Sequence, residues 1–246
     1  MNKGGLSMQN GDHIVTLDRV EKKYPLGSTE VTAVSGVSFS IAAGDFVSIA
    51  GPSGSGKTTI LNMIGCVDTP SAGLVTVAGR PTVGLKDDAI TALRREVLGF
   101  IFQSFNLVPV LSVRENVEFP LLLGGGRVGP AERAWIDRLI EEVGLSDRRD
   151  HKPGELSGGQ RQRVAIARAL VTKPKIVLAD EPTANLDSKT GEAIIRLMRL
   201  INRELGTTFV FSTHDAKIVA VADHVIRLED GKVAENRLAA PAEASR

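Results

Sequence analysis

Residues 51–58 decide the fold class and read Gly51-Pro52-Ser53-Gly54-Ser55-Gly56-Lys57-Thr58. This stretch matches the phosphate-binding loop pattern G-x-x-x-x-G-K-[ST] in full. Its glycines let the backbone wind tightly, so that several N–H groups converge on phosphate oxygens. An apolar run from Phe46 to Ala50 precedes the loop and a helical stretch follows from Lys57. This order of strand, glycine loop and helix start predicts a nucleoside triphosphate site.

The end of this loop supplies the charged and hydroxyl groups of the predicted site. Lys57 is expected to reach the β- and γ-phosphates, and the Thr58 hydroxyl is expected to hold Mg²⁺. Thr59 beside it is a further candidate nucleotide contact. The loop pattern alone does not choose between ATP and GTP.

A second stretch, Ile176-Val177-Leu178-Ala179-Asp180-Glu181, supplies two adjacent carboxylates. Its four apolar residues predict a buried strand that ends at the acidic pair. With a phosphate-binding loop in the same chain, Asp180 is expected to contact Mg²⁺. Glu181 is expected to orient or deprotonate the attacking water.

The pattern outward from these stretches favours an α/β fold. Short β-branched runs between residues 13 and 50 are broken by turns at 25–28 and 43–45. Residues 104–155 are mainly helical but carry several Pro and Gly breakers, which predicts a helical insertion. Strands and helices then alternate: a helix at 188–205, a strand at 207–212 and an Asp230-Gly231 hairpin turn within 225–233. This alternation predicts a mainly parallel sheet covered on both faces.

Composition excludes several classes of protein. The 246 residues include 30 basic and 29 acidic side chains, and this balance argues against a nucleic-acid-coating protein. No stretch approaches the ~18–20 apolar residues needed to cross a bilayer. The only cysteine, Cys66, excludes an internal disulfide and is expected to be a small buried hydrophobe.

The stretch Leu156-Ser157-Gly158-Gly159-Gln160 points to a second anion-binding helix start. Ser157 and Gln160 have the spacing of a capping box. Glycines at 158 and 159 would let a phosphate approach the helix N-terminus closely. One nucleotide seldom needs two such helix starts from one chain.

With this stretch in place, the sequence resembles the ATP-binding cassette (ABC) ATPases across nearly its whole folded length. The resemblance implies a P-loop NTPase core with a mainly parallel sheet, an N-terminal antiparallel β-subdomain and an inserted helical subdomain. It also implies that two copies pack head to tail and bind ATP between the phosphate-binding loop of one and residues 157–160 of the other. The expected boundaries are a leader at 1–12, the ATPase domain at 13–236 with its helical subdomain at about 104–155, and a tail at 237–246.

The resemblance extends to four single positions. Gln103 resembles the glutamine that senses Mg²⁺ and water, and His214 the histidine that contacts the γ-phosphate. Asp187 resembles the aspartate that links the two sites of the dimer, and it also fits the N-cap of the helix from Ser188. Tyr24 resembles the aromatic that stacks on adenine, with packing into the small sheet as the alternative.

Smaller motifs at 103–117, 151–156 and 185–187 resemble the bacterial lipoprotein-release, macrolide-export and cell-division subgroup. The resemblance implies a cytoplasmic ATPase held at the inner face of the membrane by permease subunits, with no nucleic acid partner. A groove beside Gln103 is expected to receive a permease helix, with Leu107, Val108, Val110 and Leu111 as its candidate lining; burial inside the helical subdomain is the alternative. A signalling or scaffolding cassette of the cell-division type stays open as the alternative function.

Overall fold

The computed structural model describes residues 13–27, 29–123 and 125–238. The predicted leader at 1–12 and residues 239–246 of the predicted tail lie outside these ranges. The last described strand runs to Leu238. The boundary expected at 236 is therefore two residues too early, because the final strand continues to pair with its neighbour up to Leu238.

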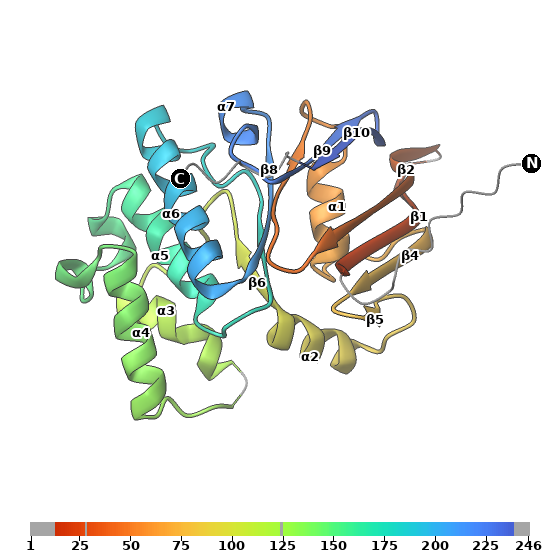
Figure 1. The fold of residues 1–246 in the computed structure, drawn as a ribbon. Helices are drawn as coiled ribbons and strands as arrows, with labels where there is room; N and C mark the ends of the chain where they lie inside the picture. The colour runs from red at the N-terminus through yellow and green to blue at the C-terminus, as the bar shows by residue number, and fades with distance from the viewer. Residues whose placement is uncertain (1–12, 28, 124, 239–246) are drawn as a thin grey trace, which may run out of the picture.

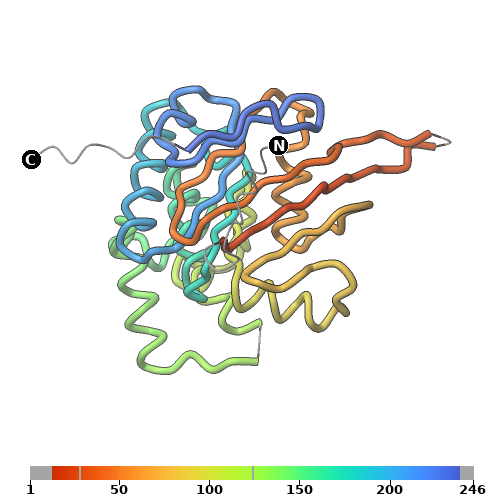
Figure 2. The backbone as a smooth tube through the Cα atoms, turned by 45° about the vertical axis from the view of Figure 1, so that its right-hand side comes forward, coloured from red at the N-terminus to blue at the C-terminus, as the bar shows by residue number. Residues whose placement is uncertain are grey.

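An antiparallel sheet forms the N-terminal part of the fold. Its strands lie in the order β2-β1-β4-β5. Their bounds are β1 His13–Leu26, β2 Thr29–Ala42, β4 Ala72–Val77 and β5 Arg80–Pro81. Strands β1 and β2 form a long hairpin that extends away from the rest of the chain (Figure 2).

The second sheet has the order β10-β9-β3-β8-β7-β6. Its first five strands in sequence pair in parallel, as predicted, and β10 closes one edge antiparallel to β9. The turn between β9 and β10 has φ of 48° at Asp230 and 74° at Gly231, as the Asp-Gly signal predicted. The bounds are β3 Phe46–Ala50, β6 Leu98–Ile101, β7 Ile176–Ala179, β8 Thr208–Thr213, β9 His224–Glu229 and β10 Lys232–Leu238.

Helices lie on both sides of this second sheet (Figure 1). Helices α3, α4 and α5 pack against one another, and α5 also contacts β6. Residues 104–155 contain α3, α4 and two short 3-10 turns, as predicted for the helical insertion. The bounds are α1 Lys57–Ile64, α2 Asp87–Val97, α3 Val113–Leu122, α4 Pro130–Glu142, η1 Ser146–Arg148, η2 Pro153–Glu155, α5 Gly158–Leu170, α6 Ser188–Leu205 and α7 Ala216–Val219.

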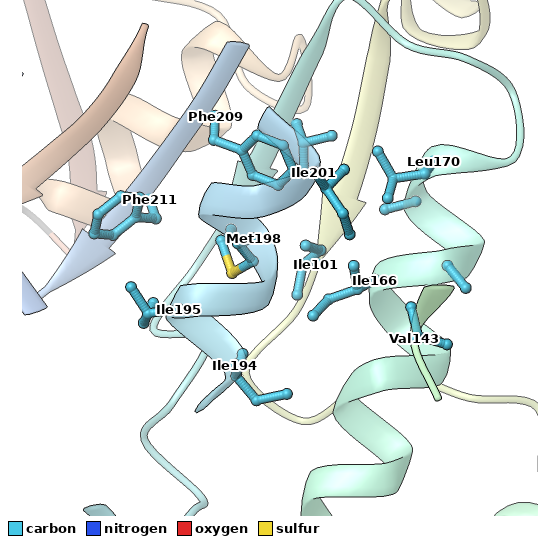
Figure 3. Close-up of a cluster of buried hydrophobic side chains, with 14 of the residues drawn as sticks. Ile101, Val143, Ile166, Leu170, Ile194, Ile195, Met198, Ile201, Phe209 and Phe211 are labelled. Atoms are coloured by element: carbon cyan, nitrogen blue, oxygen red, sulfur yellow. The ribbon is translucent and has the colours of Figure 1, made fainter. Parts of the chain in front are cut away.

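Alternation along the buried strands divides the core into two clusters. In β8, Phe209 and Phe211 face the cluster built with α5 and α6, whereas Val210 faces the cluster with α1 and the N-terminal sheet. Figure 3 shows α6 packed with Met198 and Ile201 in the first cluster. Because successive strand side chains point to opposite faces, one short strand contributes to both clusters.

Three sequence expectations match the observed elements closely. Strand β7 and helix α6 have the predicted bounds, and β8 begins one residue later than predicted.

Cys66 is buried, and this burial raises the pKa of its thiol to about 11. Within the described ranges, no helix is both long enough and apolar enough to traverse a bilayer.

Candidate functional site

A cavity of about 590 Å³ lies at the phosphate-binding loop, where β3 leads into α1. It brings the loop together with Gln103 after β6, Glu181 and Ala184 after β7, and His214 after β8. Because these strands are parallel neighbours, their carboxyl ends meet at one edge of the sheet. Its lining residues are Ala33, Pro52, Ser53, Gly54, Gly56, Lys57, Thr58, Thr59, Gln103, Glu181, Ala184 and His214.

The glycines of the loop allow close backbone approaches that a larger residue would block. A Cβ atom at Gly51 would lie 2.4 Å from the Leu228 carbonyl oxygen. A Cβ atom at Gly56 would lie 2.6 Å from the Ala33 carbonyl oxygen, and Gly56 has a φ of 99°. Ser55 carries a buried Oγ without a hydrogen-bond partner among the described residues. The loop is therefore tightly wound and has polar atoms that can form hydrogen bonds to phosphate oxygens.

The Lys57 side chain is held inside this loop. Its Nζ atom donates to the carbonyl oxygens of Gly51 and Pro52, both at 2.9 Å. The same Nζ lies 3.7 Å from Oε1 of Glu181. A buried ammonium fixed by two carbonyls presents positive charge to the cavity with little freedom to reorient.

Oxygen atoms of Thr58 and Asp180 meet at the floor of the site. The Thr58 Oγ1 atom lies 3.1 Å from both carboxylate oxygens of Asp180. Oxygen ligands of this kind suit Mg²⁺, which prefers carboxylates, hydroxyls and phosphate oxygens. The donor set therefore fits the predicted metal. Thr58 and Gln103, two residues after β6, line the cavity, whereas Asp180 is not part of its lining.

Glu181 and His214 lie in contact with each other on the lining of the cavity. The Nδ1 atom of His214 lies 3.1 Å from Oε1 of Glu181. Glu181 has a φ of 44°, a left-handed conformation that non-glycine residues rarely adopt. Its backbone N–H donates to Ser212 Oγ at 2.8 Å, and Ser212 donates to Asp180 at 2.7 Å. Ser212 therefore supports the unusual backbone of Glu181 and orients Asp180 as well.

The stretch 157–160 forms the predicted capping box at the start of α5. Gln160 N–H donates to Ser157 Oγ at 3.3 Å, and Ser157 N–H donates to Gln160 Oε1 at 2.9 Å. A Cβ atom at Gly159 would lie 2.5 Å from Thr190 Cγ2, and one at Gly158 would lie 3.2 Å from a Leu186 methyl. These glycines are therefore needed for packing inside the chain. None of the four residues lines the phosphate-loop cavity.

Asp187 and Tyr24 lie outside that cavity lining as well. Asp187 caps α6 by accepting a hydrogen bond from Thr190 N–H at 3.0 Å, as predicted, and hydrogen bonding to the Thr190 side chain and backbone lowers the pKa of its carboxyl. The Tyr24 hydroxyl donates to Asp68 at 2.7 Å.

Three polar contacts at the site were not predicted. Besides Ser212, Asn185 Nδ2 donates to the Gln103 carbonyl at 2.9 Å. Gln162 is buried and donates to the Pro182 carbonyl at 2.7 Å, which connects α5 to the segment after Glu181. The only sequence signal for Ser212 is a polar residue directly after the apolar run Phe209 to Phe211.

The arginine side chains of α5 form contacts within this chain. From the sequence, Arg161, Arg163 and Arg168 favour solvation or pairing between subunits. That interpretation is wrong for the contacts that these three side chains make in the structure, because each contacts residues of its own chain. Arg168 donates to the carbonyl oxygens of Phe105 (2.7 Å) and Asn106, Arg163 donates to the Val143 carbonyl, and Arg161 lies over the Phe105 ring. The segment after Gln103 is thereby attached to α5.

An apolar groove of about 610 Å³ lies beside this segment, between α2, β6, α3 and α5. The four residues predicted to line it, Leu107, Val108, Val110 and Leu111, are not part of its lining, and Leu107 packs on the core instead. The observed lining includes Phe100, Phe102, Phe119, Pro120 and Leu123. The prediction placed the groove correctly next to Gln103 but chose the wrong residues, because the segment turns back towards α3 through Asn116.

Comparisons with known proteins agree with this geometry. The family model described as ABC transporter matches residues 34–184. The chain is 46% identical over 233 residues to the macrolide export ATP-binding/permease protein MacB of Burkholderia pseudomallei, which covers 94% of this chain and 35% of that protein. It is 44% identical over 222 residues to the lipoprotein-releasing system ATP-binding protein LolD 1 of Rhodopseudomonas palustris, which covers 90% of this chain and 98% of that protein.

A solved structure has a similar fold over most of the chain. It is the dimeric post-hydrolysis state of the ATP-binding cassette MJ0796 bound to ADP and Pi, with a TM-score of 0.83 at 45% identity. The match covers 91% of this chain and 98% of that one. MJ0796 is an ABC transporter ATP-binding protein of Methanocaldococcus jannaschii.

Proposed function

The chain belongs to the ABC transporter family, and from that premise we propose that it is an ATP-hydrolysing subunit that pairs head to tail with a second copy and drives a separate membrane permease. The observation that carries the proposal is the position of Glu181. Its carboxylate lies 3.7 Å from the Lys57 ammonium and 3.1 Å from the His214 imidazole, in the cavity of the phosphate-binding loop.

In the proposed reaction, Glu181 accepts a proton from the water that attacks the γ-phosphate. His214 holds that water and the γ-phosphate in line, and Lys57 stabilises the charge that develops on the phosphate oxygens. Ser212 keeps the Glu181 backbone in its left-handed conformation, which directs the carboxylate into the cavity.

The nucleotide is ATP with Mg²⁺, held by the loop 51–58 and Thr59. Thr58, Asp180 and Gln103 would hold the ion, which when bound supplies positive charge to the phosphate oxygens. The adenine stacks on the ring of Tyr24.

A second copy completes the site. Residues 157–160 and Asp187 lie outside the cavity of their own chain, so their proposed contacts with nucleotide need a partner in the opposite orientation. The N-terminus of α5, with its positive dipole end, then faces the γ-phosphate of the other copy. The dimeric state of MJ0796 supports this pairing.

The proposed permease receives force through the apolar groove beside Gln103, which a short apolar helix of the permease would fill. The chain would thus sit at the inner face of the membrane, peripheral to it. MacB carries ATP-binding and permease parts in one protein, whereas LolD 1 belongs to a lipoprotein-releasing system, and both support an exporter of this type.

The test of the ATPase proposal is the substitution Glu181→Gln, which keeps the shape of the side chain but removes the base. We expect ATP hydrolysis to fall by roughly 10²–10⁴-fold. ATP should still bind, and an ATP-dependent dimer should persist in light scattering. Hydrolysis close to the wild-type rate would disprove the assigned role of Glu181.

The test of the partner is purification of the tagged chain from native membranes in mild detergent. Co-purification of an integral membrane protein that stimulates hydrolysis supports the transport role. Recovery with cell-division proteins alone would favour a signalling cassette, and recovery without any membrane protein would contradict the transporter proposal.

A further inference from the structure

Two charged side chains, Asp68 and Lys22, contact Tyr24 and each other. The Tyr24 hydroxyl donates to Asp68 Oδ2 at 2.7 Å. The Lys22 Nζ atom lies 4.9 Å from the centroid of the Tyr24 ring, in cation–π contact. Lys22 also forms an ion pair with the other carboxylate oxygen of Asp68.

Both charged groups are shielded from solvent and therefore limited in movement. The side chains of Lys22 and Asp68 are 12% and 24% exposed. Burial opposes the ionisation of Asp68, but hydrogen bonds from Lys22, Tyr24 and Thr69 N–H outweigh it and hold the pKa of this carboxyl below its usual value. Burial, with the Asp68 contact, raises the pKa of the Tyr24 phenol above its ordinary value of 10.0.

This cluster joins the hairpin to the helix that follows the phosphate-binding loop. Lys22 Nζ donates to the Thr69 carbonyl at 2.8 Å, and Lys23 N–H donates to Ser71 Oγ at 3.0 Å. The Asp68 backbone N–H donates to Asn62 in the last part of α1. The N-terminus of α1 holds the phosphate loop, while the segment after its C-terminus holds Tyr24.

We infer that Asp68 and Lys22 are positioning residues for nucleotide binding, which hold the Tyr24 ring in the orientation that stacks on the base. The inference rests on the proposed role of Tyr24 as the base platform. A ring fixed before binding loses little conformational entropy when the nucleotide arrives. Tyr24 as a whole residue is 37% exposed. A strand near the tip of a long hairpin would not fix the ring by itself, because the hairpin extends away from the rest of the chain (Figure 2).

The test compares two ligands that differ in the base. ATP and inorganic triphosphate are titrated calorimetrically without Mg²⁺, so that ATP is not consumed. Tyr24→Phe removes the hydroxyl but keeps the ring, Asp68→Asn removes the negative charge, and Lys22→Met removes the ammonium. Each should weaken ATP binding by roughly three- to tenfold while leaving the affinity for triphosphate unchanged. Asp18→Asn, at an exposed ion pair on the same strand, is the matched control and should change neither.

Tyr24→Ala separates the inference from the proposal beneath it. If this variant loses ATP affinity whereas Tyr24→Phe and Asp68→Asn bind like the wild type, stacking holds and the positioning role is wrong. If Tyr24→Ala binds ATP normally, the stacking role itself fails and the inference fails with it. An equal loss of ATP and triphosphate affinity in the positioning variants would indicate distortion of α1 and would also overturn the inference.

Discussion

The Nδ1 atom of His214 lies 3.1 Å from Oε1 of Glu181, although the two residues are 33 positions apart. One follows β8 and the other follows β7, and these strands are parallel neighbours. Their carboxyl ends therefore bring the two side chains to the same edge of the sheet. The carboxylate is 16% exposed and the imidazole 67%, so the pair forms one wall of an open cavity.

We expect His214→Ala to lower the rate of ATP hydrolysis by roughly 10²-fold or more, because the γ-phosphate and water lose a group that holds them in line. ATP affinity should fall much less, since the phosphate-binding loop is untouched. Steady-state kinetics give both values. His151→Ala, whose imidazole contacts Arg148 in the helical subdomain, is the control and should hydrolyse ATP normally. Equal rates for the two variants would contradict the role of His214.

We expect Ser212→Ala to destabilise the fold by about 1–3 kcal/mol, because the part-buried Glu181 N–H loses its acceptor and Asp180 loses the shorter of the two hydrogen bonds to one of its oxygens. Hydrolysis should also slow, since Glu181 loses support for its left-handed backbone. The matched control is Ser48→Ala on neighbouring strand β3, where the buried Oγ has no partner among the described residues. Urea unfolding should show a smaller loss, or a gain, for Ser48→Ala.

We expect Arg168→Met to destabilise the fold by about 1–3 kcal/mol, because the guanidinium donates to two carbonyls of a strained segment. Phe105 and Asn106 both have positive φ, 61° and 49°, and α5 holds them there through this side chain. Hydrogen exchange should then become faster at their amides. Arg196→Met, at an exposed pair on α6, serves as the comparison, and a similar effect from it would show that charge loss alone is responsible.

Gly159→Ala tests whether Gly159 is needed for packing within the chain or for contact with the nucleotide. Its new Cβ would meet the Thr190 methyl, and such overpacking costs about 1–3 kcal/mol. Adding Thr190→Ser removes that methyl and should restore stability in urea unfolding. If hydrolysis remains impaired in the double variant, Gly159 is also needed at the nucleotide of the other copy. Gly154→Ala, with no atom within 4 Å of its Cβ, should be neutral in both assays.

Asp223 predicts a dependence of stability on pH. Hydrogen bonding to Arg199 holds the pKa of the Asp223 carboxyl below its ordinary value of 3.8. A lowered folded-state pKa stabilises the fold fully above the ordinary value, and this stabilisation is lost as pH falls through the lower one. Unfolding free energies measured at about pH 6 and about pH 3 should differ less in Arg199→Met than in the wild type. An unchanged difference would mean that the pair adds no stability.

Contiguous patterns predicted well whatever depends on neighbours in the chain. The loop 51–58, strand β7, helix α6 and the turn at Asp230-Gly231 all follow from local chemistry. The capping box of Ser157 and Gln160 and the Asp187 cap belong here too, since donor and acceptor are three residues apart. Helix α2 is not among the elements predicted from sequence, although acidic residues in its first turn and basic residues in its last are consistent with a helix.

The sequence by itself determined the class of fold and the candidate residues of the site, because loop, strand and helix signals are short-range. Tertiary structure decided which distant groups hold those residues in place. Ser212 supports Glu181 from 31 positions away, and Arg168 reaches Phe105 across 63. Asp68 meets Tyr24 across 44 positions. These contacts depend on how strands and helices are ordered in space, and a hydrogen bond between distant residues leaves no periodic pattern in the chain.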